Sequence, residues 1–312
     1  MSTSTETTHK MYFIGVTTAQ SSMMKIFPHW MEAMGRPEVA LEGYDCKIHD
    51  DPERYRQIVA QIKNDPLALG ALITTHKLDL LAATREMFDV LDPYAQLCEE
   101  ISCIAKEGDK LVGYAVDPAA DGQAFNAIIG DRYFARFKVG VLCLGSGGAA
   151  TALALYLINR PAAGDRPKYF TLVDVDQSRL DHVRHMVEKV GTDIHFEYIC
   201  QSDPAANDQL LASLLPGSIV INATGMGKDI PGSPITARAT FPKHSIVWEL
   251  NYRGERPFLQ QALAQQKQRK LTVEDGWLCF LHGWTGVLSH VLHKPIDKAL
   301  FTRLAKIAAQ LR

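Results

Sequence analysis

The segment Lys138–Leu157, KVGVLCLGSGGAATALALYL, decides the fold of this chain. A short apolar run, Val139–Leu144, leads directly into a glycine-rich turn and then into an Ala/Leu-rich helical pattern. Glycines at a helix N-terminus present bare backbone N–H groups to an anion, because no Cβ keeps the anion away and the helix dipole adds partial positive charge. The pattern therefore predicts a strand, a turn and a helix that bind the pyrophosphate of a dinucleotide, with five cofactor residues: Gly145, Ser146, Gly147, Gly148 and Ala149.

The next apolar run, Tyr169–Val173, ends in two acidic residues, Asp174 and Asp176. An acidic residue at the end of the second strand of such a unit accepts hydrogen bonds from the adenosine ribose, and it repels a 2′-phosphate. The two aspartates therefore favour NAD over NADP. The glycines read G-x-G-G-A-A and not G-x-G-x-x-G, and the loop Asn159–Lys168 lengthens the spacing to Asp174. A glycine-rich turn without a ligand is the alternative, but the strand, glycines, helix and acidic strand end together favour a nucleotide domain.

The composition is that of an ordinary globular protein. The 312 residues are enough for two domains, and the hydrophobic and charged fractions of 46% and 22% are typical of soluble proteins. A formal net charge of −2 gives no reason to expect nucleic acid or an anionic membrane as a partner. No apolar run reaches the ~20 residues of a membrane span, and the polar start MSTSTETTHK lacks a signal core. We expect a cytoplasmic protein in which this start is a frayed tail.

The cysteines and histidines do not suggest a metal site. His182 and His185 lie in a charged helical pattern without an accompanying carboxylate or cysteine set, and a solvated helix face explains them. The sequence has no C-x-x-C pair, so we expect reduced and mostly buried thiols at its cysteines: Cys46, Cys98, Cys103, Cys143, Cys200 and Cys279.

Apolar runs and helical patterns alternate along the chain and predict an α/β fold with parallel sheets covered on both faces. In the first half we expect strands at Met11–Val16, Leu41–Cys46 and Ala68–Thr74, helices at Met24–Gly35, Asp51–Asn64 and Leu78–Leu91, a hairpin of Ile101–Ala105 with Lys110–Val116, and a helix from Asp117 to Gly130. In the second half we expect strands at Val139–Leu144, Tyr169–Val173, Ile194–Ile199, Ser218–Asn222, Ser245–Leu250 and Lys270–Glu274, and helices at Gln177–Val190, Asp208–Leu215, Phe258–Gln268, Trp277–Val291 and Ile296–Leu311.

Four further segments carry polar residues at predicted strand ends and loop starts. They are GVTTAQSSMMKIFPHW at 15–30, GALITTHK at 70–77, the stretch from EISCI to GYAVDPAADGQAF at 100–125, and a distributed set of NATGMG, WELNY and EDG in the second half. Their types and order resemble the motifs of the shikimate/quinate dehydrogenase family from Gly15 to about Val287. The resemblance implies an α/β substrate domain, a Rossmann domain for a nicotinamide dinucleotide, and closing helices that return to the first domain.

In that family a lysine and an aspartate take the proton from the substrate hydroxyl while hydride passes to the cofactor. Lys77, the last residue of GALITTHK, matches the catalytic lysine. Counting from the start of GYAVDPAADGQAF gives Asp117 as the catalytic aspartate, and counting back from its end gives Asp121 as the alternate. Asp117 precedes a proline and also suits a helix N-cap. An ion pair would orient the lysine and shift its proton affinity, which makes it a usable acid and base.

The resemblance also implies substrate contacts at Ser21, Thr74, Ser102, Tyr252 and His282. Ser21 is in register with the first carboxylate-binding serine of the family, whereas the second position holds Met23. The neighbouring Ser22 is either its substitute or a helix N-cap. His282 lies beside Gly283, where the family has a glutamine, and is either a replacement ligand or a helix-face histidine.

For the cofactor, the resemblance implies contacts beside the nicotinamide from the NATGMG loop, at Asn222, Thr224 and Gly227. The NADP-type Asn-Arg-Thr of the family is replaced by Asp174-Val175-Asp176. Without that arginine a 2′-phosphate has no evident cation, which again favours NAD, with NADP less favoured.

We therefore expect residues 1–117, with 276–312 packing back on them, to bind the substrate, and residues 118–275 to bind the dinucleotide. The expected activity is NAD-dependent oxidation of a secondary hydroxyl in a hydroxy-carboxylic acid, by a monomer or homodimer. The resemblance implies aromatic amino acid biosynthesis, but Met23, Leu72, Ser102 and Gly283 remove polar partners for shikimate and favour a less hydroxylated acid. The alternatives are a non-catalytic metabolite sensor on the same fold and a methylene-tetrahydrofolate dehydrogenase-like enzyme.

Overall fold

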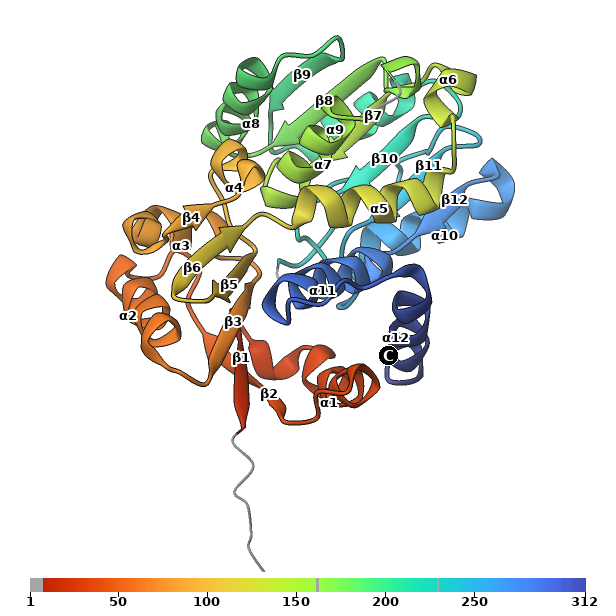
Figure 1. The fold of residues 1–312 in the computed structure, drawn as a ribbon. Helices are drawn as coiled ribbons and strands as arrows, with labels where there is room; N and C mark the ends of the chain where they lie inside the picture. Colours follow the sequence, from red (N-terminus) through yellow and green to blue (C-terminus); the bar gives the residue numbers. More distant parts are fainter. Residues whose placement is uncertain (1–7, 161–162, 229) are drawn as a thin grey trace, which may run out of the picture. The chain divides into compact units, whose positions relative to one another are not determined.

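The computed structural model describes residues 8–160, 163–228 and 230–312, and these residues form two compact units, each with its own six-stranded sheet (Figure 1). Unit 1 contains the described residues up to Val116 together with Gly283–Arg312, and unit 2 contains Asp117–His282. Of the expected frayed tail, residues 1–7 lie outside the described residues. His9 and Lys10 correct this expectation, because they are the first residues of a paired strand.

The sheet of unit 1 has the strand order β2-β1-β3-β5-β6-β4. Strands β1 (His9–Gly15), β2 (Val39–Asp45) and β3 (Ala68–Ile73) are parallel, β5 (Cys103–Glu107) and β6 (Lys110–Tyr114) form an antiparallel hairpin, and β4 (Val90–Leu91) runs parallel to β6. The helices are α1 (Met23–Met34), α2 (Pro52–Asn64), α3 (Lys77–Thr84), α4 (Pro93–Cys98), the last part of α11 (Trp277–Val291) and α12 (Lys298–Gln310), with 3-10 turns at Thr18–Gln20 and Arg85–Met87. The C-terminal ends of β1, β2, β3, β4 and β6 therefore share one side of the sheet, here called its carboxyl end.

Helix-end signals in the sequence account for the helices of unit 1. Gly35 ends α1 with a φ of 74°, which favours glycine, and Asp51 caps α2 by accepting a hydrogen bond from the Glu53 N–H at 2.9 Å. The fully buried Trp30 donates from its indole nitrogen to the Leu304 carbonyl at 2.9 Å, so α12 packs on α1. The buried side chains of the sheet with α2 and α3 form one core, which includes Tyr12, Ile14, Tyr55, Ile58, Val59, Leu80 and Ile104.

Two helix predictions are wrong at their ends. The helix expected over Leu78–Leu91 stops at Thr84, and Val90–Leu91 instead forms β4, paired with β6. The Asp89 N–H donates to the Leu111 carbonyl at 2.9 Å, which draws this segment onto the sheet. The expected helix Asp208–Leu215 is α9 (Pro204–Ser213), because the Asp-Pro pair that precedes it supplies both the cap and the first helical position. The short helices α4 and α6 (Tyr133–Phe137) were not predicted.

Unit 2 has six parallel strands in the order β12-β11-β10-β7-β8-β9. Numbered from β7, this is the 3-2-1-4-5-6 order of the Rossmann fold, read from the opposite edge, so the predicted fold class is confirmed. The strands are β7 (Val141–Leu144), β8 (Tyr169–Asp174), β9 (His195–Cys200), β10 (Ile219–Asn222), β11 (Ile246–Glu249) and β12 (Thr272–Glu274). The helices are α5 (Asp117–Ile129), α6, α7 (Gly148–Ile158), α8 (Gln177–Val190), α9, α10 (Pro257–Arg269) and the start of α11, with a 3-10 turn at Ala163–Asp165.

Packing in unit 2 follows from its small and apolar residues. Every residue of β7, β10 and β11 is buried, as expected for parallel strands covered on both faces. Gly122 lets α5 lie directly on α7, since a Cβ at this position would overlap the ring of Tyr156. Four cysteines of the chain are buried, whereas Cys200 is exposed at the end of β9. Among the described helices, none is long and apolar enough to cross a membrane.

Candidate functional site

The glycine turn, residues Gly145–Gly148, lies where β7 passes into α7. Gly145 has a φ of 103°, and a Cβ placed on it would lie 2.6 Å from the Ala223 carbonyl carbon and 2.8 Å from the Thr224 nitrogen. A Cβ on Gly147 would meet nothing within 4 Å. The first N–H groups of α7 have no partner within the helix, and the open space beside Gly147 leaves them accessible to an anion. The turn therefore fits the pyrophosphate of a dinucleotide.

The glycine turn lies at the switch point of the sheet, between the neighbouring strands β7 and β10, whose connections leave in opposite directions. The loop after β10, here called the β10 loop, spans Asn222–Gly227. Its Ala223 N–H donates to the Leu144 carbonyl at 2.6 Å, directly before the turn, and a Cβ on Gly145 would lie 2.6 Å from the Ala223 carbonyl carbon, so the loop and the turn lie side by side. The sequence-predicted cofactor residues of both segments are thus brought together in unit 2.

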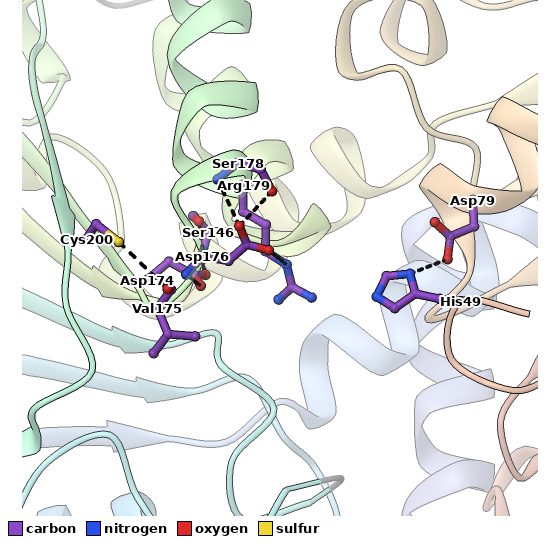
Figure 2. Close-up of polar contacts among 9 residues, drawn as sticks. All are labelled: His49, Asp79, Ser146, Asp174, Val175, Asp176, Ser178, Arg179 and Cys200. Carbon is purple, nitrogen blue, oxygen red and sulfur yellow. Dashed lines mark hydrogen bonds and ion pairs between the residues drawn. The ribbon is translucent and has the colours of Figure 1, made fainter.

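Asp174, at the end of β8, holds the glycine turn in place (Figure 2). Its Oδ2 accepts from the Ser146 N–H at 2.7 Å and from the Ser146 hydroxyl at 3.0 Å, and its Oδ1 accepts from the Asp176 N–H at 3.0 Å. Both Asp174 and Ser146 are buried. The carboxylate that was predicted to face a ribose therefore bonds the chain's own backbone.

At the same strand end, Val175 is exposed and Asp176 is half-buried. Val175 is 69% exposed, and the Asp176 Oδ1 caps α8 by accepting from Ser178 at 2.8 Å (N–H) and 2.6 Å (hydroxyl). The second oxygen of Asp176 lies 3.8 Å from the Arg179 Nε. Figure 2 draws both residues beside the end of β8. The pKa of Asp176 is lowered, chiefly by the bond from the Ser178 side chain, so the group is ionised near neutral pH. A negative charge with a nearby arginine therefore borders this edge of unit 2.

Glu249, at the end of β11, is a buried carboxyl group that sequence reasoning missed. It is 0% exposed, and its Oε2 accepts from the Asn222 Nδ2 at 2.8 Å while its Oε1 accepts from the Asn251 N–H at 2.9 Å. Burial raises the pKa of Glu249 to about 7. The sequence did hold a signal, because Glu249 is an acidic residue directly after the apolar run of a predicted strand. In this segment only Tyr252 was predicted as a site residue.

Tyr252 follows Glu249 by three residues and belongs to an aromatic cluster. Its ring centroid lies 4.4 Å from that of Phe280 and 6.0 Å from that of Trp277, and the last two rings stack at 5.0 Å. His282 lies further along α11, and burial lowers its pKa to about 4, so its imidazole is neutral at pH 7. These side chains give the Tyr252 region an apolar, aromatic character.

In unit 1, the predicted substrate residues gather at the carboxyl end of the sheet. Thr74 follows β3, and its hydroxyl donates to the Ile14 carbonyl at 3.3 Å. Ser102 lies beside it, because the Ile73 N–H donates to the Ser102 carbonyl at 2.9 Å. The Ser102 hydroxyl oxygen accepts from the Val116 N–H at 2.8 Å, which joins the start of β5 to the segment after β6.

The serines before α1 divide their roles differently from the sequence-based alternatives. Ser21 is buried, and its Oγ accepts from the Met23 N–H at 3.2 Å, so Ser21 supplies the side-chain bond to the first turn. Ser22 makes no side-chain capping bond. The side-chain capping bond that the sequence suggested for Ser22 is therefore made by Ser21.

Lys77 is the first residue of α3 and is half-buried. Its carbonyl accepts from the Ile101 N–H at 3.4 Å, which ties the lysine to the same carboxyl end as Ser102. Directly before it, the buried His76 has its Nδ1 3.0 Å from the Tyr55 hydroxyl, and burial lowers the pKa of His76. Two residues later, Asp79 pairs with His49 at 3.0 Å (Figure 2). The backbone that carries Lys77 is thus fixed on both sides.

Asp117 and Asp121 lie in the first turns of α5 in unit 2, one turn apart. Both are half-buried, and their i, i+4 spacing places them on one face of the helix, as expected. α5 begins at Asp117 itself, directly after the last residue of the first stretch of unit 1.

The fold and the glycine turn define a class: two-unit α/β proteins with one Rossmann-type unit, the architecture of many nicotinamide-dependent dehydrogenases. No protein-family model matches the chain. In sequence it is 24% identical over 233 residues to a shikimate dehydrogenase (NADP(+)) of Symbiobacterium thermophilum, a match that covers 74% of this chain and 72% of that protein.

Solved structures with this fold include a quinate dehydrogenase from Corynebacterium glutamicum in complex with NAD, with a TM-score of 0.74 and 16% identity over 97% of this chain and 99% of that one. A second solved structure is the ligand-free 5-ketofructose reductase of Gluconobacter sp. strain CHM43, with a TM-score of 0.68. It is 19% identical to this chain, and the match covers 98% of this chain and 99% of that one. The chain is therefore similar in sequence to shikimate dehydrogenases and similar in fold to a quinate dehydrogenase.

Proposed function

We propose that this protein is a dehydrogenase that oxidises a secondary hydroxyl of a small hydroxy-carboxylic acid, with a nicotinamide dinucleotide as hydride acceptor. The observation that carries the proposal is the glycine turn at the switch point of the Rossmann-type sheet in unit 2. Lysine and hydroxyl side chains at the carboxyl end of the sheet in unit 1 support it. The cofactor, when bound, supplies the hydride-accepting ring.

Unit 2 would hold the dinucleotide mainly with backbone groups. The first turn of α7 offers N–H groups to the pyrophosphate, and the absence of a side chain at Gly147 lets the phosphates approach them. The β10 loop, with Asn222, Thr224 and Gly227, would lie beside the nicotinamide half. Asp174 supports the glycine turn by bonding Ser146.

For the proton, we assign Lys77 as the group that accepts it from the substrate hydroxyl, with Asp117 as its carboxylate partner and Asp121 as the alternate. The support is chemical. Lys77 begins a helix whose backbone is fixed by neighbouring contacts. The neutral amine of a lysine can take the hydroxyl proton and become an ammonium, which a carboxylate partner would stabilise until the proton is released to solvent. We assign Ser21, Thr74 and Ser102 to the carboxylate and hydroxyls of the substrate, and Tyr252 and His282 as further substrate residues.

The substrate should carry fewer hydroxyls than shikimate. Met23 and Leu72 are buried apolar side chains where polar partners would be needed, and a Cβ at Gly283 would meet nothing within 4 Å. A site built to pair hydroxyls strongly rejects ligands that lack them. An apolar wall gives an added hydroxyl no hydrogen bond, so it favours the less hydroxylated ligand, although by a smaller factor. The aromatic rings around Tyr252 would favour a ligand with one apolar face.

We further propose NAD as the preferred cofactor. The exposed Val175 offers no cation to a 2′-phosphate, and the ionised Asp176 would repel it while accepting from a ribose hydroxyl. Arg179 could attract a phosphate, but it already lies beside the Asp176 carboxylate. The sequence relative named above is an NADP(+) enzyme, so this preference is specific to the residues of the present chain.

The direct test is a screen of shikimate, quinate and less hydroxylated cyclic and linear hydroxy acids with NAD and with NADP, followed by absorbance of the reduced cofactor. We expect turnover with NAD on an acid other than shikimate. Tight binding of an acid without any cofactor reduction would instead support a metabolite sensor. Faster turnover with NADP would overturn the cofactor assignment, and turnover that requires a folate would replace the substrate class.

A further inference from the structure

A chain of hydrogen bonds runs through the β10 loop and ends at Glu249. The Met226 N–H donates to the Thr224 Oγ1 at 3.1 Å, and that hydroxyl donates to the Asn222 Oδ1 at 2.7 Å. The Asn222 Nδ2 then donates to the Glu249 Oε2 at 2.8 Å. Each donor points the same way along the chain, so the carboxyl group of Glu249 is the terminal acceptor.

This direction is set by the acceptor, because an asparagine amide has one oxygen side and one nitrogen side. With its nitrogen on Glu249, Asn222 turns its oxygen to Thr224, where it accepts from both the N–H at 3.1 Å and the hydroxyl. Asn222 and Glu249 are both 0% exposed, so water does not compete for these bonds.

The same network fixes the β10 loop against its neighbours. The Asn251 N–H donates to the other oxygen of Glu249, and its side chain donates to the Met226 carbonyl at 3.0 Å. The Gly227 carbonyl accepts from the Arg256 N–H at 3.1 Å. At its other end, the loop contacts Gly145 of the glycine turn. A change at Glu249 would therefore be transmitted to the β10 loop.

We propose that Glu249 is a positioning residue of the dinucleotide site, whose carboxyl group orients the Asn222 amide and so holds the β10 loop in the shape that receives the nicotinamide half. The assignment of that half to the loop rests on the proposed function. The bond network itself stands on the contacts within unit 2. None of these bonds requires substrate or cofactor.

The ionisation of Glu249 adds a readout. Burial raises the pKa of Glu249 to about 7. The hydrogen bonds from the Asn251 N–H and from the Asn222 and Asn251 side chains, together with the charge of Arg256, lower this pKa but do not cancel the effect of burial. Arg256 is itself bound to Asp275 at 2.8 Å. The carboxyl group therefore changes its protonation state close to neutral pH, where its acceptor strength changes with it.

Substitution by glutamine breaks the network in a defined way. In E249Q the new side chain has one acceptor oxygen for two N–H donors, Asn222 and Asn251, so one donor loses its partner. If Asn222 rotated to repair this, its nitrogen would face the Thr224 N–H. The double variant E249Q/N222D restores the balance, because the amide at position 249 donates to the carboxylate at position 222, which still accepts from Thr224.

The first experiment measures amide hydrogen exchange in the protein without ligands, for the wild type, E249Q and E249Q/N222D. In E249Q we expect the Thr224 and Met226 amides to exchange about tenfold faster, as for the loss of one buried hydrogen bond. The Gln201 amide, which donates to the Asp174 carbonyl at the far edge of the same sheet, serves as the internal control and should not change. The double variant should return towards the wild-type rates. Unchanged protection in E249Q, or no recovery in the double variant, would overturn the proposal.

The second experiment measures dissociation constants for NADH and for ADP-ribose, which lacks the nicotinamide, between pH 6 and pH 8. We expect E249Q to weaken NADH about tenfold and ADP-ribose less than twofold. The pH dependence of NADH binding around pH 7 should disappear in E249Q. Equal losses for both ligands would overturn the positioning role. A wild type that binds NADH but turns over no acid would refute the dehydrogenase and leave this inference intact, so the two failures are distinguishable.

Discussion

The glycine turn of unit 2 and the carboxyl end of the sheet in unit 1 are built in opposite ways. The turn works through its backbone, and its four residues are contiguous in the sequence, with one positive φ at Gly145 and open space at Gly147. The carboxyl end of unit 1 works through side chains from three separate segments, at Ser21, Thr74 and Ser102. A backbone site tolerates little change, whereas a side-chain site changes its ligand with each substitution. The glycine turn can therefore keep its backbone role although its glycines depart from G-x-G-x-x-G, whereas Met23, Leu72 and Ser102 change the side chains that would meet the substrate.

The largest expected effect on stability comes from a side chain placed in the turn. In G145A the new Cβ would overlap Ala223 and the residue would keep a φ of 103°, so we expect a loss of about 2–4 kcal/mol in the free energy of unfolding. G35A is the matched control, since Gly35 also has a positive φ but no neighbour within 4 Å, and it should cost only about 1 kcal/mol. Urea unfolding measures both. Equal losses would mean that the contact between the turn and the β10 loop is not tight.

The next effect tests the side-chain site. K77A should lower turnover by about 10²–10⁴-fold, because the proton of the substrate hydroxyl loses its acceptor. The control is K63A, which removes an exposed lysine of the same unit that contacts Asp89 and the Met87 carbonyl. Steady-state kinetics with the substrate found in the screen provide the measurement. Full turnover in K77A would remove the proposed acid and base.

A smaller effect concerns the edge at the end of β8. D176N keeps a capping oxygen for α8 but removes the charge beside Arg179, so NADPH should bind about tenfold more tightly while NADH changes little. D181N, which removes an exposed aspartate further along the same helix, is the control for net charge. Fluorescence titration of both reduced cofactors tests this. A gain in D181N equal to that in D176N would show that only net charge matters.

The last effect is a pH dependence of stability. The folded-state pKa of Glu249 is raised to about 7 from an ordinary value of 4.5, so the fold favours the protonated form. Its contribution is fully present below pH 4.5 and is lost as the pH rises through 7, with an upper bound of about 3 kcal/mol. The wild type should therefore lose stability relative to E249Q between pH 5 and pH 8, measured by denaturant unfolding. A constant difference across this range would contradict the assignment.

The sequence predicted best where the structure is local. The strand, glycine turn and helix at Val139–Ile158 follow from adjacent residues, and the capping signals at Asp51 and Gly35 needed only one turn of chain. The path of the chain after Thr84 was predicted wrongly, because pairing with β6 overrode a helical pattern.

Side-chain partners could not be predicted from such patterns. Asp174 was singled out for its position at a strand end, but a pattern does not say that Ser146 takes its carboxylate. Glu249 was overlooked, because its role depends on Asn222, which lies 27 residues away in the sequence and next to it on the paired strand. Burial of a carboxyl group is a property of the assembled sheet and not of its neighbours in the chain.

The contrast between the two sites is tested most directly by titrating NADH into the wild type, G147A and K77A. A Cβ at Gly147 would fill the space beside the first turn of α7, whereas Lys77 lies in the other unit and would handle only the substrate proton. We predict that G147A weakens NADH binding at least about tenfold while K77A leaves the dissociation constant within about twofold. Normal binding by G147A, or loss of binding in K77A, would contradict the division of labour between the units.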